Sequence, residues 1–285
     1  MLTTGVCFIA VTALVKYMGP RLPAPEAAFL RYAMGLVLLF PAWRGLAEAH
    51  LTRRQWSLFA ARGFFHALGV ILWFFAMTRI PIAEVTAMNY MAPIYVTIGA
   101  AVVLGEKLAL RRIVAGCMGL AGAAGILRPG FREISTGHLA MLLAAVVFAG
   151  SYLLAKILAD EARPGVVVSM LSVFVTLGLA PFAAAVWIMP QMNELLILAA
   201  VAFFATAGHY TMTLAFAAAP VTVTQPVTFL QLVWATALGA LVFAEPVDIW
   251  VIVGGFLILS SVTFIMWREA MLKRAITPDS SATKL

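Results

Sequence analysis

Two stretches of this chain follow one pattern: residues 76–106, AMTRIPIAEVTAMNYMAPIYVTIGAAVVLGE, and residues 215–245, AFAAAPVTVTQPVTFLQLVWATALGALVFAE. At a constant offset of 139 residues they share identical pairs, namely Ala76/Ala215, Pro81/Pro220, Thr97/Thr236, Ala101/Ala240, Val103/Val242 and Glu106/Glu245. Extended over residues 60–126 and 199–265, the same offset gives 16 identities in 67 positions without a gap. A long ungapped repeat of this kind indicates two copies of one structural unit.

Most of the chain around this repeat is apolar. Hydrophobic residues make up 64% and charged residues 11% of its 285 residues, and the mean hydropathy is +1.02. Soluble domains are roughly half apolar and about a quarter charged, so a water-soluble fold of this length cannot bury so much apolar surface. At about 20 residues per membrane-spanning helix, the apolar runs predict ten spans, at residues 2–18, 25–43, 57–78, 82–104, 112–128, 137–158, 165–189, 195–217, 221–243 and 249–267.

The predicted spans divide equally between the two copies. Because five is an odd number, the second copy enters the membrane from the opposite face. We therefore predict an all-α integral membrane protein of ten transmembrane helices in two inverted five-helix repeats, with residues 1–130 as the first repeat, 136–268 as the second and 269–285 as a cytoplasmic tail. Of the 19 Lys and Arg residues, 12 lie on the side of the N-terminus, five on the other side and two within spans, which predicts that both termini are cytoplasmic.

The composition also argues against several classes of protein. The net charge of +7 comes from residues scattered between apolar runs, whereas a nucleic-acid-binding protein gathers its basic residues on one solvent face. Cys7 and Cys117 lie in apolar segments without a metal-binding spacing, and no catalytic constellation stands within the spans. We expect no metal, no cofactor and no enzyme activity. Inverted repeats are typical of alternating-access transporters, in which substrate binds near the middle of the membrane where the copies meet.

The two five-helix units, each with a proline that opens its fourth helix and a small-residue run that ends in glutamate, resemble the EamA family of the drug/metabolite transporter superfamily. Residues 88–107, Met-x-x-Met-Ala-Pro through Leu-Gly-Glu-Lys, are especially similar to the family pattern. The second copy departs from it, with Ala-Glu-Pro at 244–246, Leu232 in the place of Pro93, and Pro226 half a span earlier, where we expect the helix break to have moved. The resemblance implies a ten-helix transporter of the bacterial inner membrane, with a central cavity formed mainly by the third, fourth, eighth and ninth helices.

Polar and aromatic side chains inside the predicted spans are candidates for the substrate cavity, because polar groups are costly in lipid and face the bundle interior. These candidates are Asn89, Tyr90, Tyr95, Gln225, Gln231, Trp234 and Trp73. Tyr95 and Trp234 occupy equivalent positions in the two copies, so they either clamp a flat ligand from opposite sides or pack between helices. The amides of Asn89 and Gln231 each need hydrogen-bond partners at this depth.

Four further residues are candidates for a proton or charge site: His66, His209, Arg31 and Lys16. Histidine titrates near neutral pH and can carry a coupling proton, but a histidine in a span also serves as a hydrogen-bonded packing residue. Arg31 has no counterpart in the second copy; it either binds an anion or carboxylate, pairs with Glu26, or reaches the membrane interface. Lys16, matched by Lys156, is expected to extend its ammonium group to the interface.

Glu106 and Glu245 close equivalent helices in the two copies. We expect them to be structural pins that accept hydrogen bonds from the N-termini of neighbouring helices, where a carboxylate is favoured. Their loss is expected to impair folding as well as transport.

Together these patterns predict a secondary transporter that moves a small organic metabolite across the bacterial inner membrane by alternating access. A vitamin-like compound such as riboflavin is the leading candidate, from the aromatic and amide side chains, the few charges in the spans and the range of the family. The alternative is an exporter of amino acids or related metabolites, in which Arg31 or Lys16 binds a carboxylate. From another class, the alternative is a membrane receptor without transport. The expected partners are the small molecule, membrane lipid and a coupling proton, but not nucleic acid.

Overall fold

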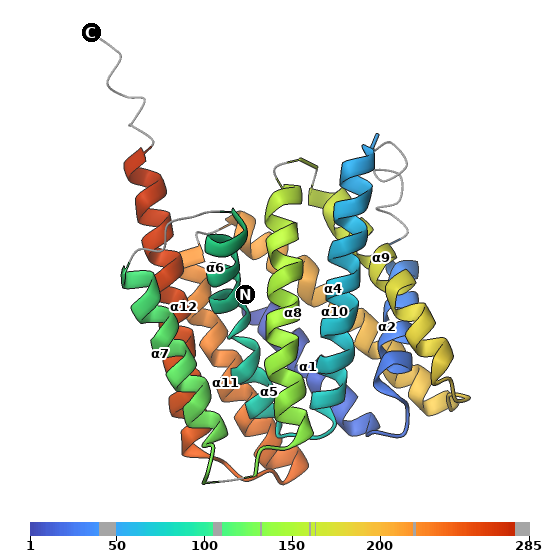
Figure 1. Cartoon of the computed structure of the whole chain (residues 1–285). Coiled ribbons are helices and arrows are strands. Elements are labelled where there is room, and N and C mark those ends of the chain that lie inside the picture. The colour runs from blue at the N-terminus through green and yellow to red at the C-terminus, as the bar shows by residue number, and fades with distance from the viewer. Residues whose placement is uncertain are drawn as a thin grey trace.

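The computed structural model describes residues 1–39, 50–104, 110–131, 133–159, 161–162, 164–218 and 221–276. The elements in these residues are all helices. With the labels of Figure 1 they are α1 (Leu2–Met18), α2 (Ala24–Leu38), α4 (Arg53–Met77), α5 (Ile82–Asn89), α6 (Ala92–Leu104), α7 (Leu110–Leu127), α8 (Thr136–Ala159), α9 (Pro164–Ala185), α10 (Met192–Ala218), α11 (Val221–Phe243) and α12 (Ile249–Ile276).

The helices make ten crossings of the bundle, because α5 and α6 follow one another in a single crossing (Figure 1). The first helix of the first copy, α1, runs downward in this view, and the first helix of the second copy, α8, runs upward. Each later helix of the second copy is likewise antiparallel to its counterpart. The predicted fold, ten transmembrane helices in two inverted five-helix repeats, is therefore confirmed.

Five of the described helices are long and apolar enough to cross a membrane by themselves, with spans at Arg53–Met77, Thr136–Ala155, Gly165–Ala185, Met192–Met212 and Ile249–Arg268. Three shorter apolar segments, Leu2–Met18, Ile113–Leu127 and Leu230–Phe243, come close to the length that a bilayer requires. The chain is thus a multi-pass membrane protein.

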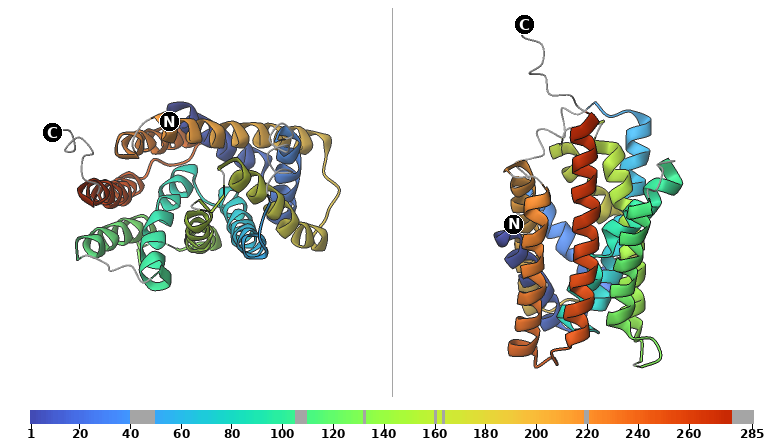
Figure 2. Two further views of the ribbon diagram at one scale, coloured as in Figure 1. Left: turned by 90° about the horizontal axis from the view of Figure 1, so that it is seen from above. Right: turned by 90° about the vertical axis from the view of Figure 1, so that its left-hand side faces the viewer.

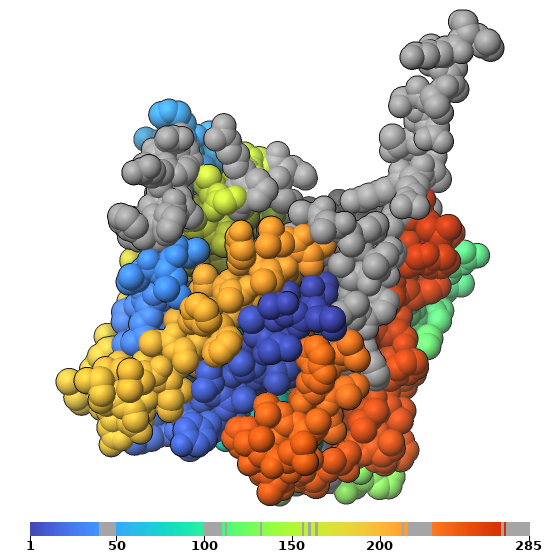
Figure 3. Space-filling model, turned by 180° about the vertical axis from the view of Figure 1, so that it is seen from behind, coloured from blue at the N-terminus to red at the C-terminus, as the bar shows by residue number. Residues whose placement is uncertain are grey.

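Contacts between helices follow the same two-fold relation as the sequence. The third helix of each copy packs on the first helix of the other copy, α4 on α8 and α10 on α1. The third helix also packs on the second helix of the other copy, α4 on α9 and α10 on α2. The fourth crossing of each copy packs on the first helix of the other copy, α6 on α8 and α11 on α1. Figure 3 shows α1, in blue, held between α10 and α11 on one face of the molecule. The core therefore lies mainly between the copies.

The last helices of the two copies, α7 and α12, lie side by side at one edge of the bundle (Figure 2). They meet at Gly122 and Gly254. A Cβ atom on Gly122 would lie 2.6 Å from the carbonyl oxygen of Gly254, and one on Gly254 would lie 2.4 Å from the carbonyl oxygen of Gly122. Only glycine permits so close an approach of two helix backbones.

The fourth crossing of the first copy is broken after Asn89. The helix α5 ends there, and α6 begins three residues later at Ala92, with Pro93 in its first turn. Proline has no N–H to donate to the carbonyl of Asn89, but it is well tolerated in the first turn of a helix. The break therefore follows from the position of Pro93.

The second copy does not contain the break that we expected near Pro226, so that expectation was wrong. The helix α11 runs through this proline without interruption. Pro226 is the sixth residue of α11, and the carbonyl that it leaves without a partner, that of Thr222, lies in the first turn, where little of the helix is disturbed. A second difference is at the C-terminus, where α12 continues to Ile276, past the expected start of the tail at residue 269.

Candidate functional site

One end of the bundle, which we call the Pro81 end, carries the linkers 19–23, 78–81, 186–191 and 244–248 at the bottom of Figure 1. Three ion pairs at this end of the described chain join the first copy to the second, namely Lys16–Glu245, Arg21–Glu194 and Arg128–Asp248. A contact between Glu84 and His138 also joins the two copies there. Opposite charges thus hold the two copies together at the Pro81 end.

Glu245, in the linker between α11 and α12, binds two groups of the first copy. Its Oε2 accepts a hydrogen bond of 2.9 Å from the backbone N–H of Ile82, the first residue of α5, where unpaired N–H groups favour a carboxylate. Its other oxygen pairs with the ammonium of Lys16, which also donates to the carbonyl of Ile80 at 2.9 Å. The side chains of Lys16 and Glu245 are only 18% and 10% exposed. The ammonium of Lys16 is therefore held by the second copy.

Glu84, in the first turn of α5, and His138, in the first turn of α8, form a second buried pair. Their side chains are 4% and 5% exposed. The Nδ1 atom of His138 accepts a hydrogen bond of 3.0 Å from the backbone N–H of Ser135, so the ring proton is on Nε2 and is donated to Glu84. A neutral imidazole is therefore sufficient to hold this contact between the copies.

Arg21 and Glu194 form a two-pronged contact on the α1–α2 linker. The Nε of Arg21 donates to Oε1 of Glu194 at 2.6 Å, and its Nη2 donates to Oε2. Hydrogen bonding to this carboxylate raises the pKa of the Arg21 guanidinium above its ordinary range. Glu26, which the sequence offered as a partner for Arg31, instead accepts a hydrogen bond of 3.0 Å from the backbone N–H of Ile188. It too joins the two copies.

The opposite end of the bundle has a weaker contact between the copies. Arg54 pairs with Glu161, and Gln55 donates to the carbonyl of Glu161 at 3.0 Å. The side chain of Arg54 is 65% exposed, so this pair contributes little to stability. Glu106, the sequence counterpart of Glu245, lies outside the described residues.

The candidate cavity residues of the fourth crossing lie at and after the break. Asn89 and Tyr90 are partly buried at the end of α5, and Tyr95 is partly buried one turn into α6. Tyr90 and Tyr95 pack against the main apolar core. Because α5 also contacts α11, this break stands next to the fourth helix of the second copy.

The candidates on α11 face α1. A Cβ atom on Gly5 of α1 would lie 2.9 Å from Cζ3 of Trp234 and 3.9 Å from Cβ of Gln231, so glycine makes room for both side chains. Trp234 packs on a small apolar cluster formed by Ile9, Ile82 and Ala235. In this conformation Trp234 and Tyr95 make no ring contact with each other within the described residues. The side chain of Gln225 lies outside the described part of the structure.

Six side chains from four helices lie near one another, and we call them the arginine cluster: Arg31 and Tyr32 on α2, Arg62 and His66 on α4, Tyr152 on α8 and His209 on α10. Tyr152 stands at the edge of this cluster and is 42% exposed. The Nε2 of His66 lies 3.1 Å from the Tyr32 hydroxyl, and its Nδ1 lies 3.3 Å from the Ser151 hydroxyl. The Arg31 guanidinium stands 3.9 Å from the centre of the Tyr32 ring. Both arginines interact electrostatically with both histidines.

The two arginines of this cluster have no acidic partner among the described residues. Arg31 is 8% and Arg62 is 7% exposed. The Nη1 of Arg62 donates to the carbonyl of Val167 at 3.0 Å, whereas its Nε has no hydrogen-bond partner. The structure shows no hydrogen bond of Arg31 to any described group. Trp73, which follows Arg62 and His66 along one face of α4, also has a buried Nε1 without a partner.

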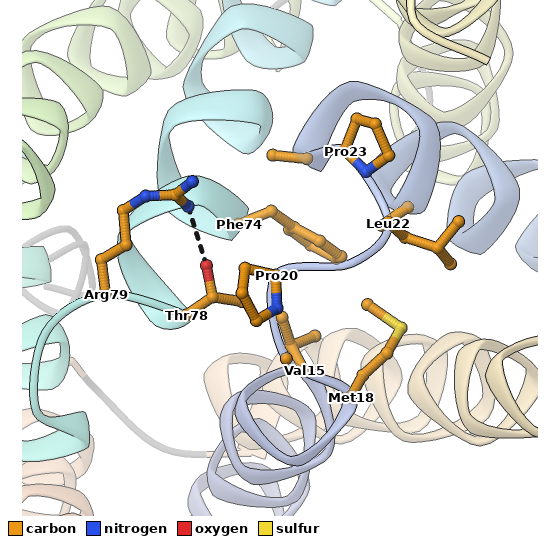
Figure 4. Close-up of a pocket in the computed structure, with 11 residues that line it drawn as sticks. Val15, Met18, Pro20, Leu22, Pro23, Phe74, Thr78 and Arg79 are labelled. Atoms are coloured by element: carbon orange, nitrogen blue, oxygen red, sulfur yellow. Dashed lines mark hydrogen bonds between the residues drawn. The ribbon is translucent and has the colours of Figure 1, made fainter. Parts of the chain in front are cut away.

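Two pockets open at the Pro81 end. One lies between the α1–α2 linker and the end of α4 and is lined in part by Val15, Leu22, Phe74 and Thr78 (Figure 4). At its rim the Arg79 guanidinium donates to the Thr78 hydroxyl at 3.0 Å. The other is lined in part by Pro81, Glu84, Glu245 and Asp248. Neither pocket includes a residue of the arginine cluster.

Several of these residues were not among the candidates chosen from the sequence. Tyr32 and Tyr152 became visible only when helices of both copies were brought together. For Arg62 the sequence left open whether it binds an anion or reaches the interface on the cytoplasmic side; the structure places it one helical turn before His66 on the same face of α4. The pair of Glu84 and His138 joins positions 54 residues apart with no local pattern.

Two inverted repeats that pack on each other, with ion pairs between the copies gathered at one end and polar side chains inside, define the architecture of a membrane transporter. The EamA-like transporter family matches residues 1–128 and 135–267. This chain belongs to the EamA-like transporter family, within the drug/metabolite transporter superfamily that its motifs indicated.

Its relatives agree in class and differ in what they carry. A riboflavin transporter of Rhizobium johnstonii is 29% identical over 280 residues, which are 96% of this chain and 92% of the relative. A pseudopaline exporter of Pseudomonas aeruginosa is 27% identical over 254 residues, 88% of this chain and 89% of the relative. A crystal structure that is 17% identical aligns with a TM-score of 0.61 over 95% of this chain and 97% of that one, which shows the fold alone. The chain is thus a transporter of small metabolites.

Proposed function

We propose that this chain is a secondary transporter that carries a small organic metabolite across the bacterial inner membrane by alternating access. The observation that supports this most is the placement of the ion pairs. At the Pro81 end each of the three ion pairs joins one copy to the other. A rocking motion of one copy against the other must break these pairs, so the Pro81 end is a gate and is closed in this structure.

The gate faces the periplasm in this proposal. The excess of Lys and Arg on the side of the N-terminus supports cytoplasmic termini. The helix α1 runs toward the Pro81 end and α12 runs away from it (Figure 1), so both ends of the chain belong to the opposite side. The structure then represents a state that is closed to the periplasm.

Riboflavin is the first substrate to test. The relative in Rhizobium johnstonii that bears the name riboflavin transporter covers almost the whole chain. The aromatic and amide side chains at the α5–α6 break and on α11, Asn89, Tyr90, Gln231 and Trp234, are suited to a flat polar ring system. We propose that these residues line the substrate path between α5 and α11, which contact each other.

A metabolite with a carboxylate is the second candidate, because Arg31 is buried and has no acidic partner in the described chain. The third candidate is a receptor that binds its ligand without transport, and one measurement distinguishes it from a transporter. A receptor binds its ligand in proteoliposomes but does not carry it into the lumen. Ligand-dependent flux therefore separates a transporter from a receptor.

The test is uptake into proteoliposomes by purified protein, first with riboflavin and then with amino acids and nucleobases. Asn89→Ala and Gln231→Ala are expected to reduce riboflavin flux at least tenfold, because each removes an amide that can bind a polar ring. Asn193→Ala is the matched control, since this amide is exposed at the start of α10. Unchanged flux in both amide variants, with normal membrane insertion, overturns the proposed path.

Proton coupling through His66 or His209 is tested in the same vesicles. If either histidine carries the coupling proton, an imposed pH gradient drives uptake, and His66→Ala or His209→Ala makes uptake independent of that gradient. Flux that ignores the gradient in the unmodified protein removes both histidines from this role.

A further inference from the structure

We infer that the arginine cluster is a binding site for an oxyanion, a carboxylate or a phosphate group, and that the transported metabolite is an organic anion. This inference rests on the proposed transport function and names the chemical class of its substrate. The site is built by Arg31 and Arg62, with Tyr32, Tyr152, His66 and His209 around them.

The first step is the balance of charge. Eight acidic residues lie in the described part of the chain. Seven of them are at helix ends or in linkers, namely Glu26, Glu84, Glu133, Glu161, Glu194, Glu245 and Asp248, and the eighth, Glu269, is in α12, which is not one of the four helices that build the cluster. Arg31, by contrast, is in the middle of α2, and Arg62 is the tenth residue of α4. No ion pair in the described chain reaches either one. The interior between α2, α4, α8 and α10 therefore carries two positive charges that no described acidic residue pairs with.

Charged side chains are costly inside a membrane protein. They normally pair with a residue of opposite charge or with a backbone carbonyl, or they mark the path of a substrate. The stacking of Arg31 on Tyr32 at 3.9 Å offsets part of this cost. The carbonyl of Val167 offsets another part at Arg62. Neither contact supplies a negative charge, so a bound anion is the group that would complete the site.

The second step is the count of hydrogen-bond donors. A guanidinium has five N–H donors in a flat fork that matches the two oxygens of a carboxylate or phosphate. Arg62 uses one of its donors, and its buried Nε has no partner. Arg31 makes no hydrogen bond within the described chain. Both residues are more than nine-tenths buried, and among their nitrogen atoms the Nε of Arg62 is fully buried without a partner.

The surroundings of the two arginines fit an organic ion better than a small inorganic one. Phe148 and Tyr152 stack with ring centres 6.1 Å apart, and Phe148 lies 5.0 Å from the ring of His66. These rings form an apolar wall beside the charges. An anion with a carbon skeleton can place its charged group on the arginines and its skeleton on the rings.

The position of the cluster also suits a transport site. Its residues come from the second and third helices of the first copy and from the first and third helices of the second. A motion of the copies relative to each other changes the distances between these residues. An anion bound between them would therefore be sensitive to the state of the transporter.

The test measures anion binding without reference to transport. Purified protein in lipid nanodiscs is heated while sodium acetate or inorganic phosphate replaces sodium chloride at constant ionic strength, and the apparent Tm is recorded. We expect a saturable rise in Tm in the unmodified protein. Arg31→Gln and Arg62→Gln are expected to weaken the apparent affinity at least about tenfold, which is the loss of one charge-assisted hydrogen bond. Comparison of the rise in Tm with acetate and the rise in Tm with phosphate shows which oxyanion the site prefers.

Arg79→Gln is the matched control, because Arg79 is an exposed arginine that stacks on Phe75 at the end of α4. It is expected to keep the full response. Arg31→Gln in chloride alone is expected to melt at the same temperature as the unmodified protein or higher, since it removes an unpaired buried charge. Failure of Arg31→Gln to fold counts against the inference, as does an equal anion response in all variants.

Flux measurements separate this inference from the proposed function. If riboflavin is carried at the same rate by the unmodified protein and by Arg31→Gln, the protein is a transporter and the anion inference is wrong. If no compound is carried but the Tm response depends on Arg31, the oxyanion site stands and the transport function fails.

Discussion

Replacing Glu245 by alanine is expected to loosen the Pro81 end. The carboxylate of Glu245 accepts the N–H of Ile82 at 2.9 Å and pairs with Lys16, and both partners belong to the other copy. The first hydrogen bond within α5 runs from Val85 to the carbonyl of Pro81, so the N–H of Ile82 depends on Glu245. Alanine leaves that N–H and the Lys16 ammonium without their acceptor.

The size of the effect follows from burial and charge. A hydrogen bond to a charged group contributes about 1.5–3 kcal/mol when its loss leaves the partner unsatisfied. Glu245 is 10% exposed and Lys16 is 18% exposed, so water replaces only part of the loss. A reduction of about 2 kcal/mol in the free energy of opening corresponds to a rise of roughly 30-fold in the population of the open end.

The assay is hydrogen–deuterium exchange of the peptide that contains Ile82, measured by mass spectrometry on protein in nanodiscs. Glu245→Ala is expected to speed exchange in this peptide by roughly 30-fold. Glu245→Gln, which keeps an uncharged acceptor, is expected to give a smaller rise. Arg54→Gln at the opposite end is the control and leaves exchange at Ile82 unchanged or slower. Equal exchange in Glu245→Ala and the unmodified protein would refute the role of this carboxylate in closing the end.

Three further perturbations test other parts of the structure. His138→Ala leaves Glu84 buried without this partner and is expected to lower stability by about 3 kcal/mol, seen as a lower apparent Tm than that of Asn193→Ala. Gly122→Val forces a side chain onto the backbone of α12 and is expected to cost about 1–3 kcal/mol; Gly125→Val is its control, because a Cβ there meets nothing within 4 Å, and the yield of monodisperse protein compares the two. Pro93→Ala supplies an N–H for the carbonyl of Asn89, so exchange across residues 90–95 is expected to slow, whereas a Pro93→Ala protein with unchanged exchange would show that another cause breaks the helix.

The fold could be predicted from the sequence because the information was local and repeated. Ten apolar runs gave the crossings, and the pairing of Pro81 with Pro220 gave the duplication. An odd number of spans per copy then fixed the inversion. Pro93 indicated the position of the helix break in the first copy, since a missing N–H acts within one turn. The same rule wrongly predicted a helix break at Pro226, because a proline near the start of a helix removes only one hydrogen bond of its first turn.

The contacts at the site could not be predicted in the same way. Arg21 and Glu194 are 173 residues apart, and Glu84 and His138 are 54 residues apart. No periodicity connects such positions, and only the packing of one copy on the other brings them together. Lys16 shows the difference clearly: as a lysine at a helix end it suggested an interfacial position, but the second copy places Glu245 within its reach.

The charges of this transporter have two different arrangements, and the difference bears on how it works. At the Pro81 end Lys16, Arg21 and Arg128 each meet an anion of the other copy, so opening this end exposes the separated charges to water, which solvates them at modest cost. In the arginine cluster two buried cations have no anionic partner among the described residues. The protein can therefore break its own contacts at the end, but only a bound group can neutralise the centre. On this reasoning an anionic substrate both binds at the arginines and lowers the cost of holding them inside while the two copies move.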